Sequence, residues 1–431
     1  MTISPSASLQ KTSLPGPHDI IRERLTSGIT VLLRPNPNSL SVSMAGYLHA
    51  GSLYEPEEKL GLADFTAESL LRGTRQSTFQ EIFEKLESLG ASLRFSGGTH
   101  TAGFAGKSLA ADLDTLLGLT AEALMEPVFP DKHIERLRAQ ALIGLDLRAQ
   151  DTSEMASLGF DQIAFADHPY RLPEDGYPET ITAITRDDMV SFHHKHYGPQ
   201  GMVISLVGAV EPDEVIQQLE TLFNAWQNPE QPEIIEVGNP KPLKETIHNH
   251  HAIPEKSQAD IVLGCVGPRR DSPDFLPARL GNSVLGQFGM MGRIGESVRN
   301  KAGYAYYAYS SLSSSIGPGA WTVSAGVDPA NLDNAIELII KELERFVTEP
   351  VAEEELQDNQ SSMIGKLPLA LESNAGVAGA LLTIERHHLG LDYFQKFEET
   401  IKQVTRENAL ETAQKYLDPG RLAISTAGPE Q

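Results

Sequence analysis

The sequence contains a single cysteine, Cys265, so no disulfide can form within the chain. This scarcity favours a reducing compartment, and we predict a cytoplasmic location. Long apolar runs are also missing, because stretches such as GMVISLVGAV are far shorter than the ~20 residues that a membrane-spanning helix needs. The N-terminal residues have neither an apolar core behind basic residues nor many arginines, so we expect no signal peptide and no mitochondrial presequence.

Positive charge is in short supply. Lys and Arg number 35 against 58 Asp and Glu, which gives a formal net charge of −23. Nucleic acid and anionic membrane surfaces repel such a chain, so we expect neither as a partner. A hydrophobic fraction of 40% is ordinary for a globular protein, and 431 residues exceed one ordinary core, so we expect two or more domains.

A repeat with a spacing of 220 residues organises the chain. The segment ITAITRDDMVSFHHKHYGPQGMVISLVGAV, which starts at Ile181, aligns without gaps with IKQVTRENALETAQKYLDPGRLAISTAGPE, which starts at Ile401. Matched pairs include Thr185 with Thr405 and Ser205 with Ser425. Each copy predicts a helix, a turn marked by proline and a short apolar strand. The chain is therefore predicted to contain two homologous halves.

Four segments follow from this repeat and from composition. Residues 1–20 are predicted to be a flexible leader, 21–227 the first α+β half, 228–244 an extended proline-rich linker, and 245–431 the second half. Strand patterns such as GITVLLRPN alternate irregularly with helix patterns such as TFQEIFEKLESLG, for which Thr78 is the expected N-cap. The predicted fold class is α+β, with two homologous halves that each have an antiparallel sheet and helices packed on one side.

Several segments resemble the pitrilysin and insulinase-like metallopeptidases, the inverzincins, and particularly their bacterial and mitochondrial-processing-peptidase branch. In chain order they are SGITVLL, GYLHAGSLYE, GLADFTAESLLRGT, LESLGASL, MEPVFP, DHPY, FHHKHYGPQGMVISLVG and GRIGESVRNKAGYAYYAYS. The resemblance runs from about Thr26 to Gly428 and rests on the order and spacing of these segments together. It implies the clam-like fold of that family.

The resemblance directs attention first to GLADFTAESLLRGT. Active members of the family carry H-x-x-E-H there, in which two histidines bind zinc and the glutamate acts as general base for zinc-bound water. The resemblance places Asp64 at the first histidine, Ala67 at the glutamate and Glu68 at the second histidine. The third ligand position falls in LIGLDLRAQ, where Asp146 is the nearest candidate. Alanine cannot accept a proton, so the general base is absent.

Two interpretations of Asp64, Glu68 and Asp146 stay open. They could form a carboxylate cluster that holds calcium or magnesium and supports weak hydrolysis, or they could be a polar helix face without metal. Hydrolytic zinc is usually held by at least one imidazole or thiolate, and this set of hard oxygen donors contains neither. We favour the metal-free interpretation, and we expect no cofactor in this chain.

The second motif of the family, R-x(6)-Y after a glycine-containing loop, is intact. Arg299 and Tyr306 in VRNKAGYAY follow LGQFGMMG. The resemblance implies that the Tyr306 hydroxyl donates to the scissile carbonyl or its oxyanion, and that Arg299 positions the substrate or the tyrosine. Both groups are strong donors suited to developing negative charge. The alternative is that Arg299 is a surface cation and Tyr306 one of several strand tyrosines.

In the two-chain branch of this family one subunit supplies the zinc helix, the other supplies the Arg/Tyr pair, and together they enclose an extended peptide. The resemblance therefore implies a non-catalytic subunit of a heterodimeric zinc metallopeptidase, inactive alone. Its expected partners are a homologous subunit that bears H-x-x-E-H, where zinc is expected, and a peptide substrate. The alternative function is a structural or assembly protein of the same fold with no proteolytic role.

Overall fold

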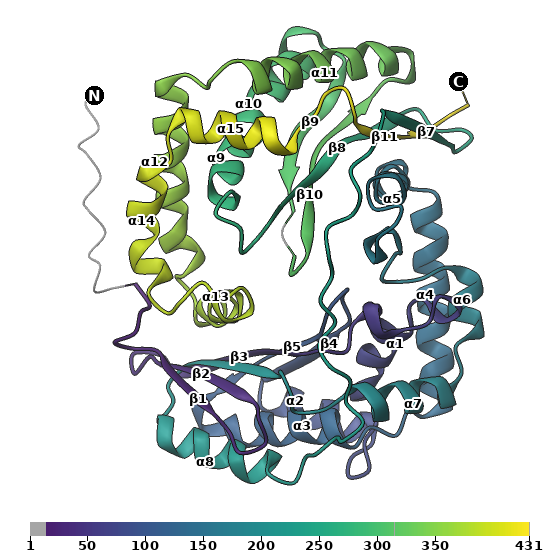
Figure 1. The fold of residues 1–431 in the computed structure, drawn as a ribbon. Coiled ribbons are helices and arrows are strands. Elements are labelled where there is room, and N and C mark those ends of the chain that lie inside the picture. The colour runs from purple at the N-terminus through teal and green to yellow at the C-terminus, as the bar shows by residue number, and fades with distance from the viewer. Residues whose placement is uncertain (1–13, 314, 431) are drawn as a thin grey trace.

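Each half of the molecule consists of one sheet and the helices around it (Figure 1). The computed structural model describes residues 14–313 and 315–430. The first sheet has the strand order β1-β2-β6-β3-β5-β4 and the second the order β7-β11-β8-β10-β9, so the same topology occurs twice with one extra edge strand in the first half. The predicted α+β class, built from two similar halves, is confirmed.

The first half contains the strands β1 (Ile21–Arg24), β2 (Thr30–Pro35), β3 (Ser41–Leu48), β4 (Ser92–Ser96), β5 (Ala102–Leu109) and β6 (Val203–Gly208). Its helices are α1 (Leu62–Ser69), α2 (Phe79–Ser88), α3 (Leu113–Met125), α4 (Asp131–Ala149), α5 (Thr152–Ala164), α6 (Pro178–Ala183), α7 (Arg186–His196) and α8 (Pro212–Phe223).

The second half contains the strands β7 (Ile247–Ala252), β8 (Ala259–Arg269), β9 (Ala305–Leu312), β10 (Pro318–Val327) and β11 (Ala423–Gly428). Its helices are α9 (Phe275–Gly286), α10 (Gly292–Ile294), which continues as a π-helix (Gly295–Lys301), α11 (Leu332–Thr348), α12 (Glu353–Ala370), α13 (Asn374–Arg386), α14 (Tyr393–Gln403) and α15 (Arg406–Tyr416).

Local capping explains where several of these helices begin. Thr78 accepts a hydrogen bond from the Glu81 amide at the start of α2, as predicted, and Glu81 bonds back to form a capping box. The repeat partners Thr185 and Thr405 start α7 and α15 with the same capping box. The helix–turn–strand units predicted from the repeat are therefore present in both halves.

One strand pair in each sheet departs from the predicted antiparallel arrangement. β2 pairs with β6 in parallel, and β7 pairs with β11 in parallel, whereas the other pairs in both sheets are antiparallel. In each half a long helical segment separates the last strand from the strands before it. Such a crossover connection lets the last strand enter the sheet parallel to its neighbour.

The halves exchange one helix each, which the predicted boundaries did not include. α13 of the second half packs on β6 and β3, and α5 of the first half packs on β11 and β8. On β6, Val203 and Val207 contact the α13 core, whereas Ile204 faces the core of its own half. Both helices lie between the two sheets (Figure 1). Each sheet is thus covered by its own helices on one face, as predicted, and by a borrowed helix on the other.

The predicted flexible leader needs a correction over its described part. Residues 1–13 lie outside the described residues. Leu14 and Ile20 are buried in the same core as α13 and the inner face of β6, and Asp19 pairs with Arg34 at 2.7 Å. Apolar side chains at both ends of this short segment bury against the second half, so residues 14–20 are packed.

The segment 228–244, predicted to be a linker, contains no helix or strand. It is nevertheless held in place, because the Ile235 amide donates to the Tyr54 hydroxyl at 3.2 Å and the Lys241 amide donates to Asp167 at 3.1 Å. The connection between the halves is extended and bonded to the first half.

Among the described residues, no single helix has the length and apolar composition needed to cross a membrane. α12 and α13 meet these requirements only together, as a pair bent by 115°.

Candidate functional site

The helix α1 carries the degenerate metal motif, and the half-buried carboxylate of Glu55 bonds to its N-terminus. Glu55 accepts hydrogen bonds from the amides of Gly61 and Ala63 at 2.9 and 2.7 Å. These amides lie at the positive end of the helix, where a carboxylate is favoured. Burial nevertheless raises the pKa of Glu55 to about 7, although the two amides oppose this shift. The helix N-terminus is therefore fixed by a group whose charge is poorly solvated.

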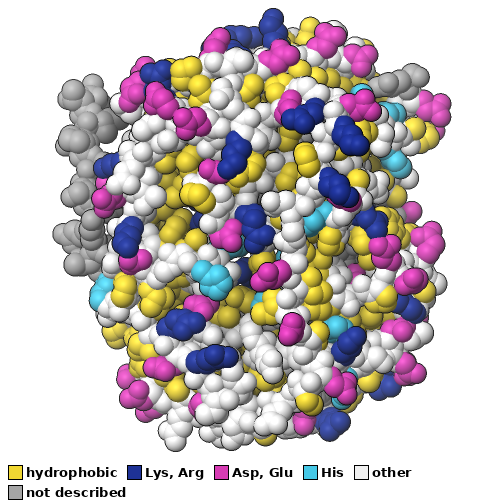
Figure 2. Space-filling model, viewed as in Figure 1, with side chains coloured by type: hydrophobic (Ala, Val, Ile, Leu, Met, Phe, Trp, Pro, Cys, Tyr) yellow, Lys and Arg dark blue, Asp and Glu magenta, His cyan; other side chains and the backbone are white. Residues whose placement is uncertain are grey.

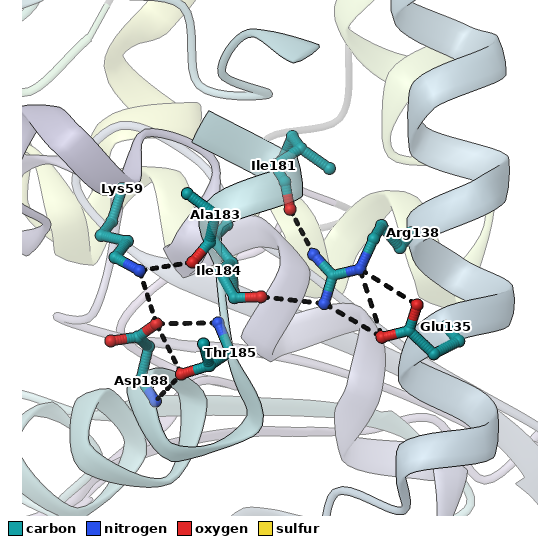
Figure 3. A network of polar contacts seen from close by, with 8 residues as sticks. All are labelled: Lys59, Glu135, Arg138, Ile181, Ala183, Ile184, Thr185 and Asp188. Atoms are coloured by element: carbon teal, nitrogen blue, oxygen red, sulfur yellow. Dashed lines mark hydrogen bonds and ion pairs between the residues drawn. The ribbon is translucent and has the colours of Figure 1, made fainter. Parts of the chain in front are cut away.

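Neighbouring helices hold α1 at the side. Arg138 of α4 donates to the carbonyl oxygens of Ile181 and Ile184 at the end of α6, the latter at 2.8 Å (Figure 3). Its guanidinium also lies over the ring of Phe65 in α1, 5.5 Å from the ring centre. One side chain thus joins three helices around the motif.

The two carboxylates of the motif differ in exposure, because Asp64 is half-buried and Glu68 is exposed. Asp64 accepts a hydrogen bond from the Gly97 amide at 2.7 Å. Burial raises the pKa of Asp64, and the nearby charges of Glu174 and Asp175 add to the shift. Burial also raises the pKa of Glu68, and Asp64 contributes to that shift. The charge of Asp64 therefore disfavours the charged form of Glu68.

The other two motif positions do not add donors. Ala67 is fully buried in the core of the first half. Asp146 is exposed on α4, whereas its neighbour Leu145 is buried in the core that contains the apolar side chains of α1. Asp146 was only the nearest candidate for the third ligand position, and among the described residues no metal-binding group joins it to Asp64 and Glu68.

The donors present do not fit zinc. In residues 14–313 and 315–430 no group of three or more His, Cys, Asp or Glu side chains could hold a metal ion. Asp64 already accepts a backbone hydrogen bond, and zinc in hydrolytic sites takes three protein ligands that usually include histidine. We derive no catalytic step through a metal in this chain.

A cavity of about 470 Å³ lies where the two halves meet, next to α1. Asp64 and Tyr170 of the first half line it, together with Ser315 from the turn between β9 and β10 and Gly319 near the start of β10. Its acidic residues are Asp64, Glu154, Asp161, Glu174 and Asp175, whereas Arg148 is the basic one. Charged and histidine side chains also surround the middle of the face shown in Figure 2.

Sequence reasoning missed two parts of this cavity. Burial raises the pKa of Asp161, on α5, to about 7. The Tyr170 hydroxyl accepts from the Gly317 amide at 2.9 Å and donates to Ser315 at 3.2 Å, which ties the halves together. A β-carbon at Gly317 would lie 2.3 Å from the Tyr170 oxygen, so this contact requires glycine. The segment DHPY, which ends at Tyr170, was the only available signal.

Arg299 and Tyr306 lie away from the core. Arg299 belongs to the π-helix Gly295–Lys301, a rare form that is frequent at functional sites, and is half-buried. Tyr306, near the start of β9, has an exposed fraction of 80%. Among the residues described, neither side chain forms a hydrogen bond or an ion pair. The two donors are therefore available to a group outside this chain.

Two protein-family models match the chain. The model described as insulinase (peptidase family M16) matches residues 30–166, and the model described as the peptidase M16 inactive domain matches residues 183–363. A relative from Mycobacterium leprae, described as an uncharacterized zinc protease, is 25% identical over 98% of this chain and 92% of its own length.

Solved structures share the fold. The peptidase M16 inactive domain from Pseudomonas fluorescens superposes with a TM-score of 0.88 at 25% identity, and the match covers 96% of this chain and 98% of that chain. A chain of complex III from Candida albicans has a TM-score of 0.76 at 17% identity, covering 95% of both chains, which shows a similarity of fold alone. The two family models match both halves of the sequence, and the chain belongs to the insulinase family of peptidases, peptidase family M16.

Proposed function

We propose that this chain is the non-catalytic subunit of a heterodimeric zinc metallopeptidase. It binds a peptide substrate and supplies Arg299 and Tyr306 to the zinc site of a homologous subunit that bears H-x-x-E-H. The observation that carries this proposal is the state of the general-base position: Ala67 is fully buried and has no group that can take a proton. The chain therefore depends on another subunit for the activation of water.

The cavity between the halves supports the peptide part of the proposal. Among the described residues that line it are several carboxylates and a single basic side chain, Arg148. Extended peptides present amide groups and, at lysine, arginine and the N-terminus, positive charges that such a lining attracts. Asp161 and Asp64 are half-buried there, so a cationic group of the peptide would favour their charged forms.

The Arg/Tyr pair supports the catalytic part. Zinc in the partner subunit would activate the attacking water and polarise the scissile carbonyl. The hydroxyl of Tyr306 and the guanidinium of Arg299 can donate hydrogen bonds to the oxygen on which negative charge develops. A donor without a partner in its own chain needs no intramolecular hydrogen bond broken when the other subunit binds, which suits the 80% exposure of Tyr306.

Reconstitution tests the proposal. The purified chain, given zinc and a fluorogenic peptide, is expected to show no cleavage, and a homologue with an intact H-x-x-E-H is expected to restore turnover. In that pair, Tyr306→Phe should lower kcat about 10²-fold with little change in KM, as for the loss of one oxyanion donor. Tyr309→Phe, which removes a partly exposed hydroxyl from the same strand, is the matched control and should leave kcat unchanged.

Two results would contradict the proposal. Chelator-sensitive cleavage by the lone chain would show that it carries its own metal site. A purely structural role would be indicated if Arg299→Ala and Tyr306→Phe both left the turnover of the reconstituted pair unchanged.

A further inference from the structure

A row of three residues crosses the second sheet beside Tyr306. Gly326 on β10 is paired with Asp260 on β8 and with Tyr307 on β9. Asp260 and Tyr307 are therefore two strands apart, or roughly 10 Å. The Tyr307 hydroxyl nevertheless donates a hydrogen bond to the Asp260 carboxylate. Its side chain reaches across the intervening strand.

The crossing depends on the missing side chain of Gly326. A β-carbon built there would lie 2.5 Å from Cε1 of Tyr307 and 3.0 Å from Oδ1 of Asp260. The tyrosine ring therefore occupies the space that any other residue would fill at this position. The backbone at Gly326 is not in the left-handed region, so any residue could adopt its conformation. Glycine is required only because the tyrosine ring approaches so closely.

Asp260 also joins the two halves. Asp260 is buried, with an exposed fraction of 2%. It accepts from the Thr152 hydroxyl at the start of α5, the helix that the first half contributes, and from Gln258 at 3.0 and 3.1 Å. Buried carboxylates need several donors to offset their lost hydration, and this one draws them from both halves.

The row ends at a β-bulge that contains Tyr306. β9 pairs with β10 through Tyr307 opposite Gly326 and Ala305 opposite Val327, so Tyr306 has no partner on β10. A bulge leaves its extra residue outside the ladder and re-aims its side chain. Tyr307, which is bonded to Asp260, is the regularly paired residue directly next to the bulge residue Tyr306.

We propose that Tyr307 and Asp260 are positioning residues for Tyr306, and that Thr152 links this bulge to the first half. The inference rests on the proposed function of Tyr306. The tether of Tyr307 to Asp260 fixes the register of β9 at the bulge, so the Tyr306 hydroxyl is held in one direction before the partner binds. A movement of α5 relative to the second sheet would act on the bulge through Thr152.

Hydrogen exchange of the lone chain tests this positioning without any activity. Tyr307→Phe keeps the ring but removes the tether, Gly326→Ala displaces the ring, and Thr152→Val removes only the donor from the first half. All three should speed exchange of the amides of residues 304–308 at least tenfold, while the amides of β11 stay unchanged. Tyr309→Phe is the control, since its ring lies 5.7 Å from that of Tyr307 on the same strand. Unchanged exchange in Tyr307→Phe and Gly326→Ala would overturn the inference.

The reconstituted pair gives a second readout. Tyr307→Phe should lower kcat about tenfold with little change in KM. In a variant that already carries Tyr306→Phe, Tyr307→Phe should not lower kcat further, because the hydroxyl that it positions is absent. Losses that multiply in the double variant would indicate a role independent of Tyr306 and overturn the inference. If the wild-type pair is inactive, the proposed function fails, and the exchange experiment alone decides whether the bulge is tethered.

Discussion

The two candidate sites of this molecule lie in similar halves but differ in how their polar side chains are bonded. In the first half the carboxylates near α1 are turned inward: Glu55 bonds to the start of the helix, and Asp64 bonds to the Gly97 amide. In the second half Arg299 and Tyr306 form no side-chain bond to any described residue, and Tyr306 is 80% exposed. Glu55 and Asp64 thus accept hydrogen bonds from the chain's own backbone, whereas Arg299 and Tyr306 remain available to another molecule.

The exchanged helices allow the strongest test of whether the halves are independent. Phe160 of α5 is 2% exposed in a core that also contains Ala423 and Ala427 of β11. Phe160→Ala should lower the free energy of unfolding by about 3–5 kcal/mol. In a Trp226→Phe background, urea unfolding followed by the fluorescence of Trp321, in the second half, should report the full loss, although the substitution is in the first half. Gln162→Ala, exposed on the same helix, is the control and should change stability by less than about 0.5 kcal/mol.

The pH dependence of stability tests the cavity between the halves. Burial raises the pKa of Asp161 to about 7, so the folded chain holds this proton more tightly than the unfolded chain does. Its contribution to stability therefore falls as the pH rises from about 4 to 7, by at most about 4 kcal/mol. Asp161→Asn should match the wild type at pH 4 and be more stable at pH 8, as measured by urea titration. Equal stability at both pH values would show that the carboxylate is well hydrated.

The general-base position provides the next test. Ala67→Glu places an ionisable group at a fully buried site in the first core. We expect a loss of about 3 kcal/mol, from overpacking and from an unpaired buried carboxyl group, seen as a lower midpoint of thermal unfolding. Asp146→Glu, on the exposed face of α4, should have no measurable effect. A stable Ala67→Glu variant would mean that the motif on α1 still has space and water for a carboxylate. The difference between this site and the Arg299/Tyr306 site would then disappear.

The smallest expected effect is a difference in stability between substitutions at two matched positions of the repeat. Asp188 accepts from the Thr185 amide at 2.7 Å and also from Lys59 at 2.8 Å (Figure 3). Asn408, at the matching position, accepts from the Thr405 amide at 3.1 Å. Asp188→Ala should cost about 1 kcal/mol and Asn408→Ala about half as much. Equal losses in paired denaturation curves would show that Lys59 contributes nothing.

Local features of the sequence predicted the elements well, and for a physical reason. The cap predicted at Thr78 depends on residues three positions apart, and the alignment of the two copies supported the same helix after Thr185 and after Thr405. The exchange of α5 and α13 had no such signal, because each helix packs on strands that are distant in the sequence.

The candidate site was predicted less completely. The positions of Asp64 and Glu68 on one helix follow from their spacing, and the effect of Asp64 on the pKa of Glu68 agrees with it. Whether Leu145 or Asp146 faces α1 depends on a rotation of about 100° per residue around α4, which only tertiary packing decides. The link from Tyr307 to Asp260 depends on the register of three strands, and no local pattern reveals it.

The exchange of α5 and α13 has a consequence for cutting the chain. A fragment that ends in the segment 228–244 would lack α13 and leave Val203 and Val207 of β6 bare, and the complementary fragment would lack α5. Each piece alone would therefore be prone to aggregate, whereas a mixture of the two should reassemble without a covalent connection. The two similar halves are therefore expected to fold only in each other's presence.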